Sequence, residues 1–418
     1  MKLSHRLFVA FAMVLYSYAQ PTALSQGVML RSVGAVNASV GGTATAMPLD
    51  AMGALQWNPA SISALPKNEM AFGLELVMAD SRVKSSVSTP MTMSGSTKGE
   101  QGVVPAPSMG IVWSKNRQSP YTFGLGLGAV GGAASLYPHT PFSGANPNPV
   151  LMSHGRSATV VVLQVTPTVA VQLTERWSVG VAPLIDLASL TVNPMSLGRK
   201  TDESLMTYGT KYVWGGGFQI GTLYDFKNHV KAGFMFKSPI WAEKLYFTGT
   251  RYGTSGTPIA DSNKFQLQLP MTLSAGLSYD GFRNTVIGMD VRYLDYDNAA
   301  GLNSGMVDGV VEGLGWESVY SICVGAERTI NSKLRGRLGY CWNENPIPGR
   351  SAALCISAPM ITQHVLSCGF SYAIVKDLEL SAAYSHAFEA KNTGPIPGGS
   401  VTNILSANSV FAGVTKKW

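Results

Sequence analysis

The sequence is short of charge, of cysteine and of long apolar runs. Charged residues occupy 13% of its 418 positions, about half of the roughly 25% found in soluble domains. After residue 19 there is no run of about 18 apolar residues, so we predict no transmembrane helix in the mature chain. The four cysteines lie in the last quarter without CxxC spacing, which argues against a zinc ribbon. They are Cys323, Cys341, Cys355 and Cys368.

The N-terminus has the composition of a secretory signal. Lys2, His5 and Arg6 precede an apolar run over residues 7–19, which is too short to cross a bilayer. We therefore predict a signal peptide over residues 1–19, with an N-terminal anchor helix as the alternative. In an exported chain the cysteines are interpreted as small apolar fillers, and a disulfide of undetermined pairing stays open.

The excess of positive charge is scattered. The formal net charge is +7 and the isoelectric point is near 9.1, yet no polybasic tract occurs. Nucleic-acid binding would need such residues clustered on one face or along one helix. We therefore predict no nucleic-acid partner.

What the sequence has in plenty is alternation with period two. Every second residue from Met70 to Met78 is large and apolar, and the same alternation continues over about fifteen residues from Phe265 to Tyr279. Alternation places one class of side chain on each face of a sheet. Strands of soluble sandwiches usually have about 5–6 residues, whereas a tilted strand needs about 9–11 to cross a bilayer. The longer strands here favour a membrane barrel.

The connections between these strands alternate between short turns and long polar loops. That asymmetry is typical of an outer-membrane barrel, whose short turns face the periplasm. We predict an all-β, antiparallel transmembrane barrel over residues 68–418, with an even number of strands, about fourteen. The strands are expected near 68–80, 105–115, 121–131, 156–173, 177–192, 208–226, 229–248, 264–280, 284–296, 315–330, 333–343, 361–375, 378–388 and 403–418. The long loops are expected at 131–155, 192–207, 249–263, 297–314, 344–360 and 389–402.

Residues 20–67 do not alternate. They are rich in Gly and Ala and can form only short helices and turns. The segment Asn58-Pro59-Ala60 is a compact turn directly ahead of the first strand, because Pro59 restricts the residue before it and Asn58 can bond locally. We predict a plug, or hatch, inside the lumen, with this turn at its base. The alternative is a flexible periplasmic tail.

Two sequence motifs resemble functional sites, one for nucleotide binding and one for catalysis, but neither meets the requirements of such a site. Residues 126–131 match GxGxxG, but a dinucleotide site needs a following helix and an acidic residue about 20 positions on. No acidic residue lies between Tyr121 and Thr174. Ser385 and His386 are neighbours on one strand, so they point to opposite faces and cannot act as a nucleophile and base. We predict no enzyme activity, no cofactor and no metal site.

Basic residues on the predicted strands are candidates for contact with a substrate. Arg335 and Arg337 share one face of a strand, and Lys237 and Arg292 lie on two others. A guanidinium pairs bidentately with a carboxylate, so these four side chains can hold an anionic substrate. The alternative is that they are solvated charges of the lumen.

Five quoted stretches together resemble the FadL family of outer-membrane transporters for long-chain fatty acids and aromatic hydrocarbons. They are GAVNASVGGTATAMPLDAMGALQWNPASISALP, FMFKSP, LQLPMTLSAGLSY, LRGRLGYCWNENPIPG and the run from Pro359 through AYSHAF. The resemblance implies a fourteen-stranded barrel in the outer membrane with an N-terminal hatch. It also implies passive uptake: capture in an apolar pocket and sideways release at a kinked third strand. The glycine-rich third strand offers Gly124, Gly126, Gly128, Gly131 and Gly132 for that kink.

The resemblance also implies partners. They are a hydrophobic small-molecule substrate, outer-membrane lipid and lipopolysaccharide, and the barrel assembly machinery, with the protein itself a monomer. One departure is the terminal residue, Trp418, where such barrels often end in Phe.

Uptake of hydrophobic molecules is the leading hypothesis, and a general diffusion porin is the second. A porin needs an open, charged lumen, whereas several inward positions here are Gly, Ala, Ser and Thr. A membrane enzyme or a surface adhesin is the third. Apolar pockets discriminate weakly between ligands, so the sequence leaves the substrate open.

Overall fold

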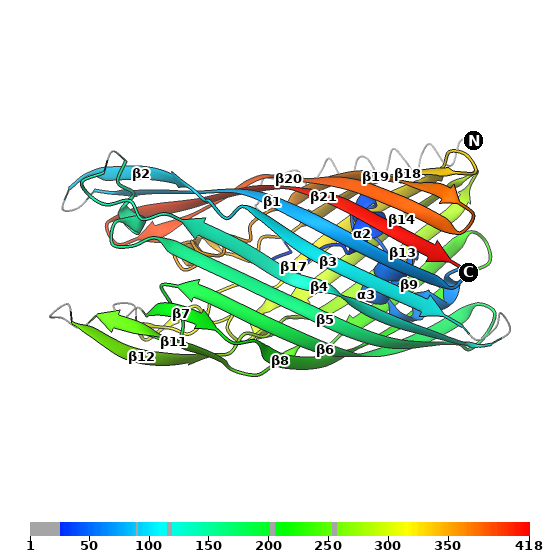
Figure 1. The fold of residues 1–418 in the computed structure, drawn as a ribbon, viewed down its shortest axis with the longest axis horizontal. Coiled ribbons are helices and arrows are strands. Elements are labelled where there is room, and N and C mark those ends of the chain that lie inside the picture. Colours follow the sequence, from blue (N-terminus) through cyan, green and yellow to red (C-terminus); the bar gives the residue numbers. More distant parts are fainter. Residues whose placement is uncertain (1–25, 89–90, 115–118, 145, 201–204, 253–256) are drawn as a thin grey trace.

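The structure is a closed antiparallel barrel. It is a computed structural model that describes residues 26–418 apart from 89–90, 115–118, 145, 201–204 and 253–256. Within this part of the chain, fourteen strands form the barrel around a few short helices (Figure 1). None of the described helices is long and apolar enough to cross a membrane. The predicted fold class is confirmed, and the predicted signal peptide, 1–19, lies outside the described residues.

The barrel strands occur in the predicted order, one for each expected strand. Pairing of the last strand with the first, and of β8 with β9, closes the ring. The strands are β1 (Glu69–Val87), β3 (Val103–Trp113), β4 (Tyr121–Tyr137), β5 (Arg156–Gln172), β6 (Trp177–Asn193), β8 (Val213–Asp225), β9 (Val230–Lys237), β13 (Met271–Phe282), β14 (Thr285–Asp295), β17 (Val319–Thr329), β18 (Leu334–Asn343), β19 (His364–Val375), β20 (Leu378–Ile396) and β21 (Gly399–Lys417).

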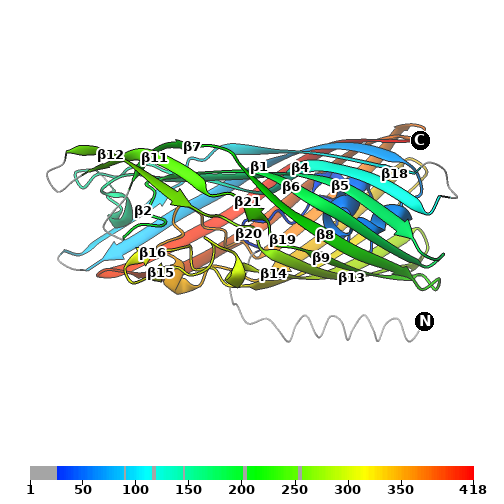
Figure 2. The same ribbon diagram turned by 90° about the horizontal axis from the view of Figure 1, so that it is seen from below.

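Short turns gather at one end of the barrel, together with the C-terminus (Figure 1). At this short-turn end the Trp418 backbone N–H donates to the Asn68 carbonyl at 3.1 Å, so the last residue is bonded to the start of the first strand. The opposite, long-loop end carries the smaller elements (Figure 2). They are β2 (Met93–Lys98), β7 (Met206–Thr210), β10 (Trp241–Ala242), β11 (Leu245–Tyr252), β12 (Pro258–Phe265), β15 (Met306–Val307), β16 (Val310–Val311), η2 (Pro149–Leu151), η3 (Tyr296–Asn298) and η4 (Gly349–Ser351).

Several predicted boundaries at the long-loop end were wrong. The expected loop 389–402 is a continuous hairpin, because β20 and β21 stay paired as far as Ile396 and Gly399. β4 likewise continues to Tyr137, into the expected loop 131–155. Conversely, the expected strand 229–248 is interrupted after Lys237, and the strand 264–280 regains its pairing only at Met271. Both interruptions coincide with a proline, Pro239 and Pro270, which has no N–H to give to a neighbouring strand.

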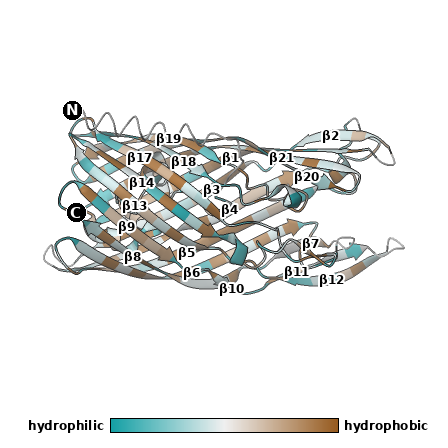
Figure 3. Cartoon of the chain, turned by 180° about the vertical axis from the view of Figure 1, so that it is seen from behind, coloured by the Kyte–Doolittle hydropathy of each residue, from teal (hydrophilic) through white to brown (hydrophobic). Residues whose placement is uncertain are grey.

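The outer face of the barrel is apolar. On β1 the side chains of Phe72, Leu74 and Leu76 are among the exposed large hydrophobic residues. Figure 3 shows hydrophobic residues recurring along the barrel strands. Exposed aromatic residues, including Trp113 and Trp177, lie near the short turns, as in the aromatic girdle of a membrane barrel. This outward face is the one that the period-two pattern predicts.

Residues 26–67, here called the hatch, lie inside the barrel toward its short-turn end. They form α2 (Gly34–Ser39), α3 (Ala51–Trp57) and η1 (Pro59–Ala64), and most of their side chains are buried. The Asp50 carboxylate caps α3 by accepting from the Gly53 N–H at 3.0 Å. The wall is thinned by glycines where the hatch touches it. A Cβ at Gly325 or Gly339 would overlap the backbone of the hatch at Val40 and Gly41.

One cysteine pair is joined. Cys323 on β17 and Cys341 on β18 are cross-strand neighbours in register and form a disulfide. Cys355 and Cys368 are free. The disulfide corrects the interpretation of all four cysteines as apolar fillers and settles the pairing that the sequence left open.

Candidate functional site

The wall of the barrel is interrupted between β3 and β4. These strands pair only from Ser108–Gly128 to Trp113–Phe123. Beyond Ser108, β3 continues against β1 as far as Val103, and β4 continues against β5 as far as Tyr137. Residues 103–107 and 129–135 therefore face each other without pairing. We call this region the wall gap.

Two prolines in β3 explain why the pairing stops. Pro105 and Pro107 have no N–H group to donate. The bridges between β3 and β1 continue past both prolines, and each antiparallel bridge requires a donor from β3. The N–H groups that remain must therefore point to β1, so the missing donors belong to the edge that faces β4. Sequence reasoning missed this feature, although prolines at alternate positions of a strand indicate an unpaired edge.

The hatch covers the edge that β4 leaves free. The Leu30 N–H donates to the Val130 carbonyl at 2.9 Å, and the Gly132 N–H donates to the Val28 carbonyl at 3.2 Å. Residues 28–30, here called the seal segment, thus add a short antiparallel strand to β4, centred on an isolated bridge between Met29 and Gly131.

The glycines predicted to kink the third strand fall into two groups. The register of β4 against β5 shifts between Ala129 and Gly131, so Gly131 and Gly132 lie at the irregular region beside the wall gap. Gly124, Gly126 and Gly128 lie in regularly paired strand. A Cβ at Gly124 would overlap the Leu55 side chain, so this glycine makes room for α3. The GxGxxG stretch lies wholly within β4, with no helix after it.

An apolar cavity of about 180 Å³ lies behind the wall gap. The hatch from Gly27 to Ser32 forms one side, and gap residues such as Val104, Ala106 and Ala133 form another. A second apolar cavity, of about 60 Å³, lies toward the long-loop end between Leu197, Phe265 and Trp316. The two cavities share Val28, Ala133, Val160 and Met360 in their linings. The two cavities are therefore adjacent. We call the one behind the wall gap the inner cavity and the one toward the long-loop end the outer cavity.

The inner cavity contains two charged groups. Among its described lining residues, Arg31 of the hatch and Glu75 of β1 are the charged ones. Burial lowers the pKa of Arg31 from its ordinary value, and the nearby Glu75 partly offsets this. Sequence reasoning did not single out either residue. Arg31 lies in a segment without periodicity, and Glu75 occupies an ordinary polar position of an alternating strand.

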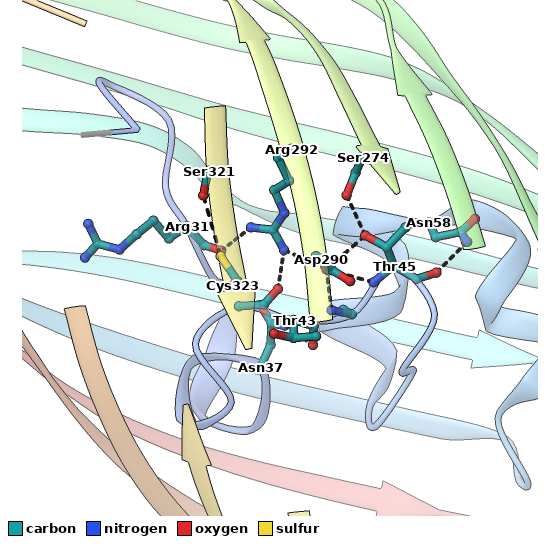
Figure 4. Close-up of polar contacts among 12 residues, drawn as sticks. Arg31, Asn37, Thr43, Thr45, Asn58, Ser274, Asp290, Arg292, Ser321 and Cys323 are labelled. Carbon is teal, nitrogen blue, oxygen red and sulfur yellow. Dashed lines mark hydrogen bonds and ion pairs between the residues drawn. The ribbon is translucent and has the colours of Figure 1, made fainter. Parts of the chain in front are cut away.

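Arg292, predicted to meet a substrate carboxylate, instead holds the hatch (Figure 4). Its side chain is fully buried and lies 3.0 Å from the Asp290 carboxylate. It donates to the backbone carbonyls of Arg31, at 3.2 Å, and Gly42. The guanidinium also lies 3.4 Å from the centre of the Trp57 ring. All of these partners except Asp290 belong to the hatch.

Asp290 completes the attachment from the same strand. Its carboxylate accepts from the Ala44 N–H at 2.9 Å and from the Thr45 N–H and hydroxyl at 3.1 and 2.9 Å. The Thr45 hydroxyl lies 2.6 Å from that of Ser274 on β13. Asp290 and Arg292 therefore clamp the chain on both sides of Gly42 (Figure 4).

Two of the other three predicted cations are paired with groups of the barrel wall. Arg335 pairs with Glu379, and Arg337 lies 2.6 Å from Glu327 and 2.8 Å from the Ser371 hydroxyl. Lys237 is buried, and none of the four predicted cations lines the inner cavity. Their placement gives no support to a contact with substrate.

The turn Asn58-Pro59-Ala60 is fixed to the wall. The Asn58 side-chain amide donates to the carbonyls of Thr45, at 2.7 Å, and of Thr222 on β8, at 3.0 Å. Its side-chain oxygen accepts from the Ala60 N–H at 3.0 Å, and Pro59 begins η1. A Cβ at Gly180 or Gly221 would overlap this turn, so the wall accommodates it closely. The geometry favours an anchor at this position.

Asp50 makes the seating of the hatch sensitive to pH. Burial, and next the nearby Glu69, raise the pKa of Asp50 to about 7, although the Gly53 N–H opposes this. Its unfolded value is 3.8, so the seated hatch binds a proton that the released hatch loses. The contribution of Asp50 protonation to the stability of the seated hatch is therefore complete below a pH of about 4, and it declines as the pH rises toward 7.

We expect Gly339→Ala to unseat the hatch, because the new Cβ would overlap the backbone at Gly41. Hydrogen exchange measured by mass spectrometry should show hatch amides exchanging about tenfold faster or more. Gly336→Ala is the matched control on the same strand, since its Cβ would meet only the Ile330 side chain, at 3.2 Å. Equal protection of the hatch in the two variants would contradict the close packing.

Comparison with known proteins gives one family and a set of similar barrels. The family described as outer membrane protein transport protein (OMPP1/FadL/TodX) matches residues 17–400. No curated protein sequence matches the chain.

Three solved structures illustrate the likeness of fold. The P. putida toluene transporter TodX has a TM-score of 0.72 and 17% identity, covering 93% of this chain and 99% of its own. The Ralstonia pickettii toluene transporter TbuX gives 0.67 and 18%, with the same coverage. A Pseudomonas aeruginosa FadL homologue gives 0.70 and 13%, covering 94% of this chain and 99% of its own.

Proposed function

Because this chain belongs to the OMPP1/FadL/TodX family of outer membrane transport proteins, we propose that it takes up hydrophobic small molecules by passive diffusion. The family is one of transport proteins, which agrees with the prediction that the chain is not an enzyme. The observation that carries the proposal is the wall gap, which lies beside an apolar cavity and is covered by the seal segment. A passage to a gap in the wall leads into the membrane rather than straight through the lumen.

The proposed route has three stages. The substrate enters the outer cavity from the extracellular side, where Leu197, Phe265 and Trp316 offer apolar surface. It then moves into the inner cavity past the residues that line both. It leaves between β3 and β4 once the seal segment separates from β4. No energy source is needed, because removal of apolar surface from water favours each step toward the membrane.

The seal segment is the part of the hatch best suited to move. Two backbone hydrogen bonds hold it to β4, and together such bonds contribute on the order of 1–3 kcal/mol. The rest of the hatch is held by the buried charges of Asp290 and Arg292 and by Asn58. A hinge near Arg31 would let residues 28–30 separate while α2 and α3 remain seated.

A general diffusion porin is the second candidate, and the structure does not favour it. A porin requires a lumen that water fills from end to end. Here the buried hatch occupies the lumen, with contacts to strands from β1 to β21. The two toluene transporters with a similar fold suggest aromatic hydrocarbons as substrate, and the sequence resemblance to the FadL family suggests fatty acids.

Further partners follow from the same proposal. The apolar outer face would contact membrane lipid and lipopolysaccharide, and the aromatic Trp418 would be read by the barrel assembly machinery. The described barrel strands close into a ring, so none of them is an edge strand that a second copy of the chain could extend, which supports a monomer. We also propose that residues 1–19 are removed on export and that 20–67 and 68–418 act as hatch and barrel.

The route can be tested by restoring donors to the edge of β3. Pro105→Val with Pro107→Val should allow β3 to pair further with β4, and we expect uptake of toluene into cells to fall several-fold. Pro183→Val is the matched control, because Pro183 is another exposed strand proline and lies away from β3 and β4; it pairs with Phe218 of β8, whereas no bridge joins it to β5. Unchanged uptake in the double variant would exclude the wall gap as the exit.

A liposome experiment tests the alternative function. If small sugars pass through the wild-type protein as fast as toluene, the protein is a general diffusion porin instead.

A further inference from the structure

Arg31 lines an apolar cavity, and its charged group has no bonded partner in the part of the chain that the structure describes. Its backbone carbonyl is fixed by Arg292, but its side chain points away from that clamp (Figure 4). Among the described residues, no hydrogen bond or ion pair within 4 Å involves its guanidinium. Arg31 is half-buried, and a guanidinium that faces an apolar cavity with no such partner among the described residues adds no hydrogen bond or ion pair to the fold, so this placement needs a reason other than stability.

Glu75 carries the opposite charge in the same cavity, yet among the described residues it does not form an ion pair with Arg31. The two groups interact electrostatically, and the Ser409 hydroxyl donates to the Glu75 carboxylate. Ser409 and Glu75 come from neighbouring wall strands, β21 and β1, whereas Arg31 comes from the hatch. The fork of N–H donors on Arg31 therefore stays available to an oxygen acid that enters the cavity.

We propose that Arg31 binds the acidic head group of the substrate, while its hydrocarbon part lies among the apolar residues of the inner cavity. This assignment rests on the proposed uptake function and narrows its substrate to hydrophobic carboxylic acids. Apolar lining alone discriminates weakly, whereas a charge-assisted bidentate contact requires a planar anion. The selectivity thus resides in the hatch rather than in the wall.

Glu75 gives the proposal a second, opposite consequence. A ligand carboxylate beside Arg31 brings a like charge close to Glu75, which opposes binding unless one of the two carboxylates takes up a proton. Removing the charge of Glu75 leaves Arg31 as an uncompensated cation. Glu75→Gln should therefore bind an acid more tightly, and Arg31→Met should bind it less tightly.

The test measures equilibrium binding of dodecanoate and of dodecanol, its neutral counterpart, to the protein in lipid nanodiscs, with empty nanodiscs as the reference. We expect Arg31→Met to weaken dodecanoate binding about tenfold, the equivalent of one charge-assisted bond, and to leave dodecanol binding within about twofold. Arg31→Lys should recover part of the loss, because it keeps the charge without the fork. Glu75→Gln should tighten dodecanoate binding several-fold.

The possible outcomes distinguish a failure of the acid-binding role of Arg31 from a failure of the proposed uptake function. If wild-type protein binds neither compound, the proposed uptake of hydrophobic molecules fails. If it binds both and Arg31→Met lowers both equally, Arg31 supports the cavity only structurally and the acid assignment is overturned. If Arg31→Met does not fold, Glu75→Gln still decides, since weaker dodecanoate binding in that variant contradicts the proposal.

Discussion

Asp290→Ala barrels are expected to conduct ions and to admit hydrophilic antibiotics that the wild-type protein excludes. The Asp290 carboxylate is fully buried, accepts three hydrogen bonds from Ala44 and Thr45, and neutralises Arg292. Removing one partner of a buried ion pair typically costs about 3–5 kcal/mol, because the other charge is left uncompensated. That loss falls on the contacts between hatch and wall, so the hatch should be displaced from the lumen for much of the time.

Single-channel recordings in planar bilayers would measure this effect directly. Asp295→Ala is the matched control: Asp295 lies at the end of the same strand, and its carboxylate bonds to Asn298 in the adjoining loop rather than to the hatch. We expect stepwise conductance in the Asp290 variant and none in the control. A closed Asp290→Ala barrel would show that the hatch is held mainly by shape.

Tying the seal segment to the wall is expected to abolish uptake. Met29 and Gly131 face each other as a pair whose neighbours, rather than they themselves, form the hydrogen bonds. Such a pair has Cα atoms about 4.5 Å apart, within the range that a disulfide spans. Met29→Cys with Gly131→Cys should therefore cross-link, since a Cβ at Gly131 would meet the Val28 carbonyl at a tolerable 3.3 Å. Uptake of dodecanoate should fall about tenfold or more when the protein is oxidised and return on reduction.

Two controls isolate the cross-link. Each single cysteine variant should transport normally, and wild-type protein treated with the same reductant accounts for the native Cys323–Cys341 disulfide. If the cross-linked protein transports as well as the reduced one, the seal segment does not need to leave β4. Transport would then have to follow a route through the body of the hatch, and the Asp290 variant would become the informative one.

The two predictions together divide the hatch into a fixed and a movable part. The Asp290–Arg292 clamp holds residues 42–45 with buried, charge-assisted contacts, and Asn58 fixes its turn with neutral amide hydrogen bonds. The seal segment has two backbone bonds to β4, and the Tyr296 hydroxyl donates to the carbonyl of Gln26, just ahead of that segment, at 2.6 Å. Arg31 lies between the two parts, so a ligand held by its side chain would be placed where the movable part begins.

The family resemblance and the alternation were enough to predict the barrel, its fourteen strands and the plug. They failed at the ends of strands, where prolines or continued pairing decide the boundary. The candidate site was predicted less well. Gly131 and Gly132 lie beside the wall gap, but the four chosen cations lie elsewhere, and neither Arg31 nor the two prolines of β3 were identified.

What the sequence determined by itself is local. Period-two alternation fixes which face of each strand meets lipid, and Pro105 and Pro107 fix which donors β3 lacks, because both follow from the covalent chain alone. The tertiary structure decided which charges are free. Asp290 accepts a hydrogen bond from Ala44, which lies 246 positions away in the sequence. Such long-range contacts hold Arg292 between Asp290 and the hatch, whereas they leave the side chain of Arg31 open to the cavity. A charge of either kind looks the same in the sequence, because its function depends on what the fold brings against it.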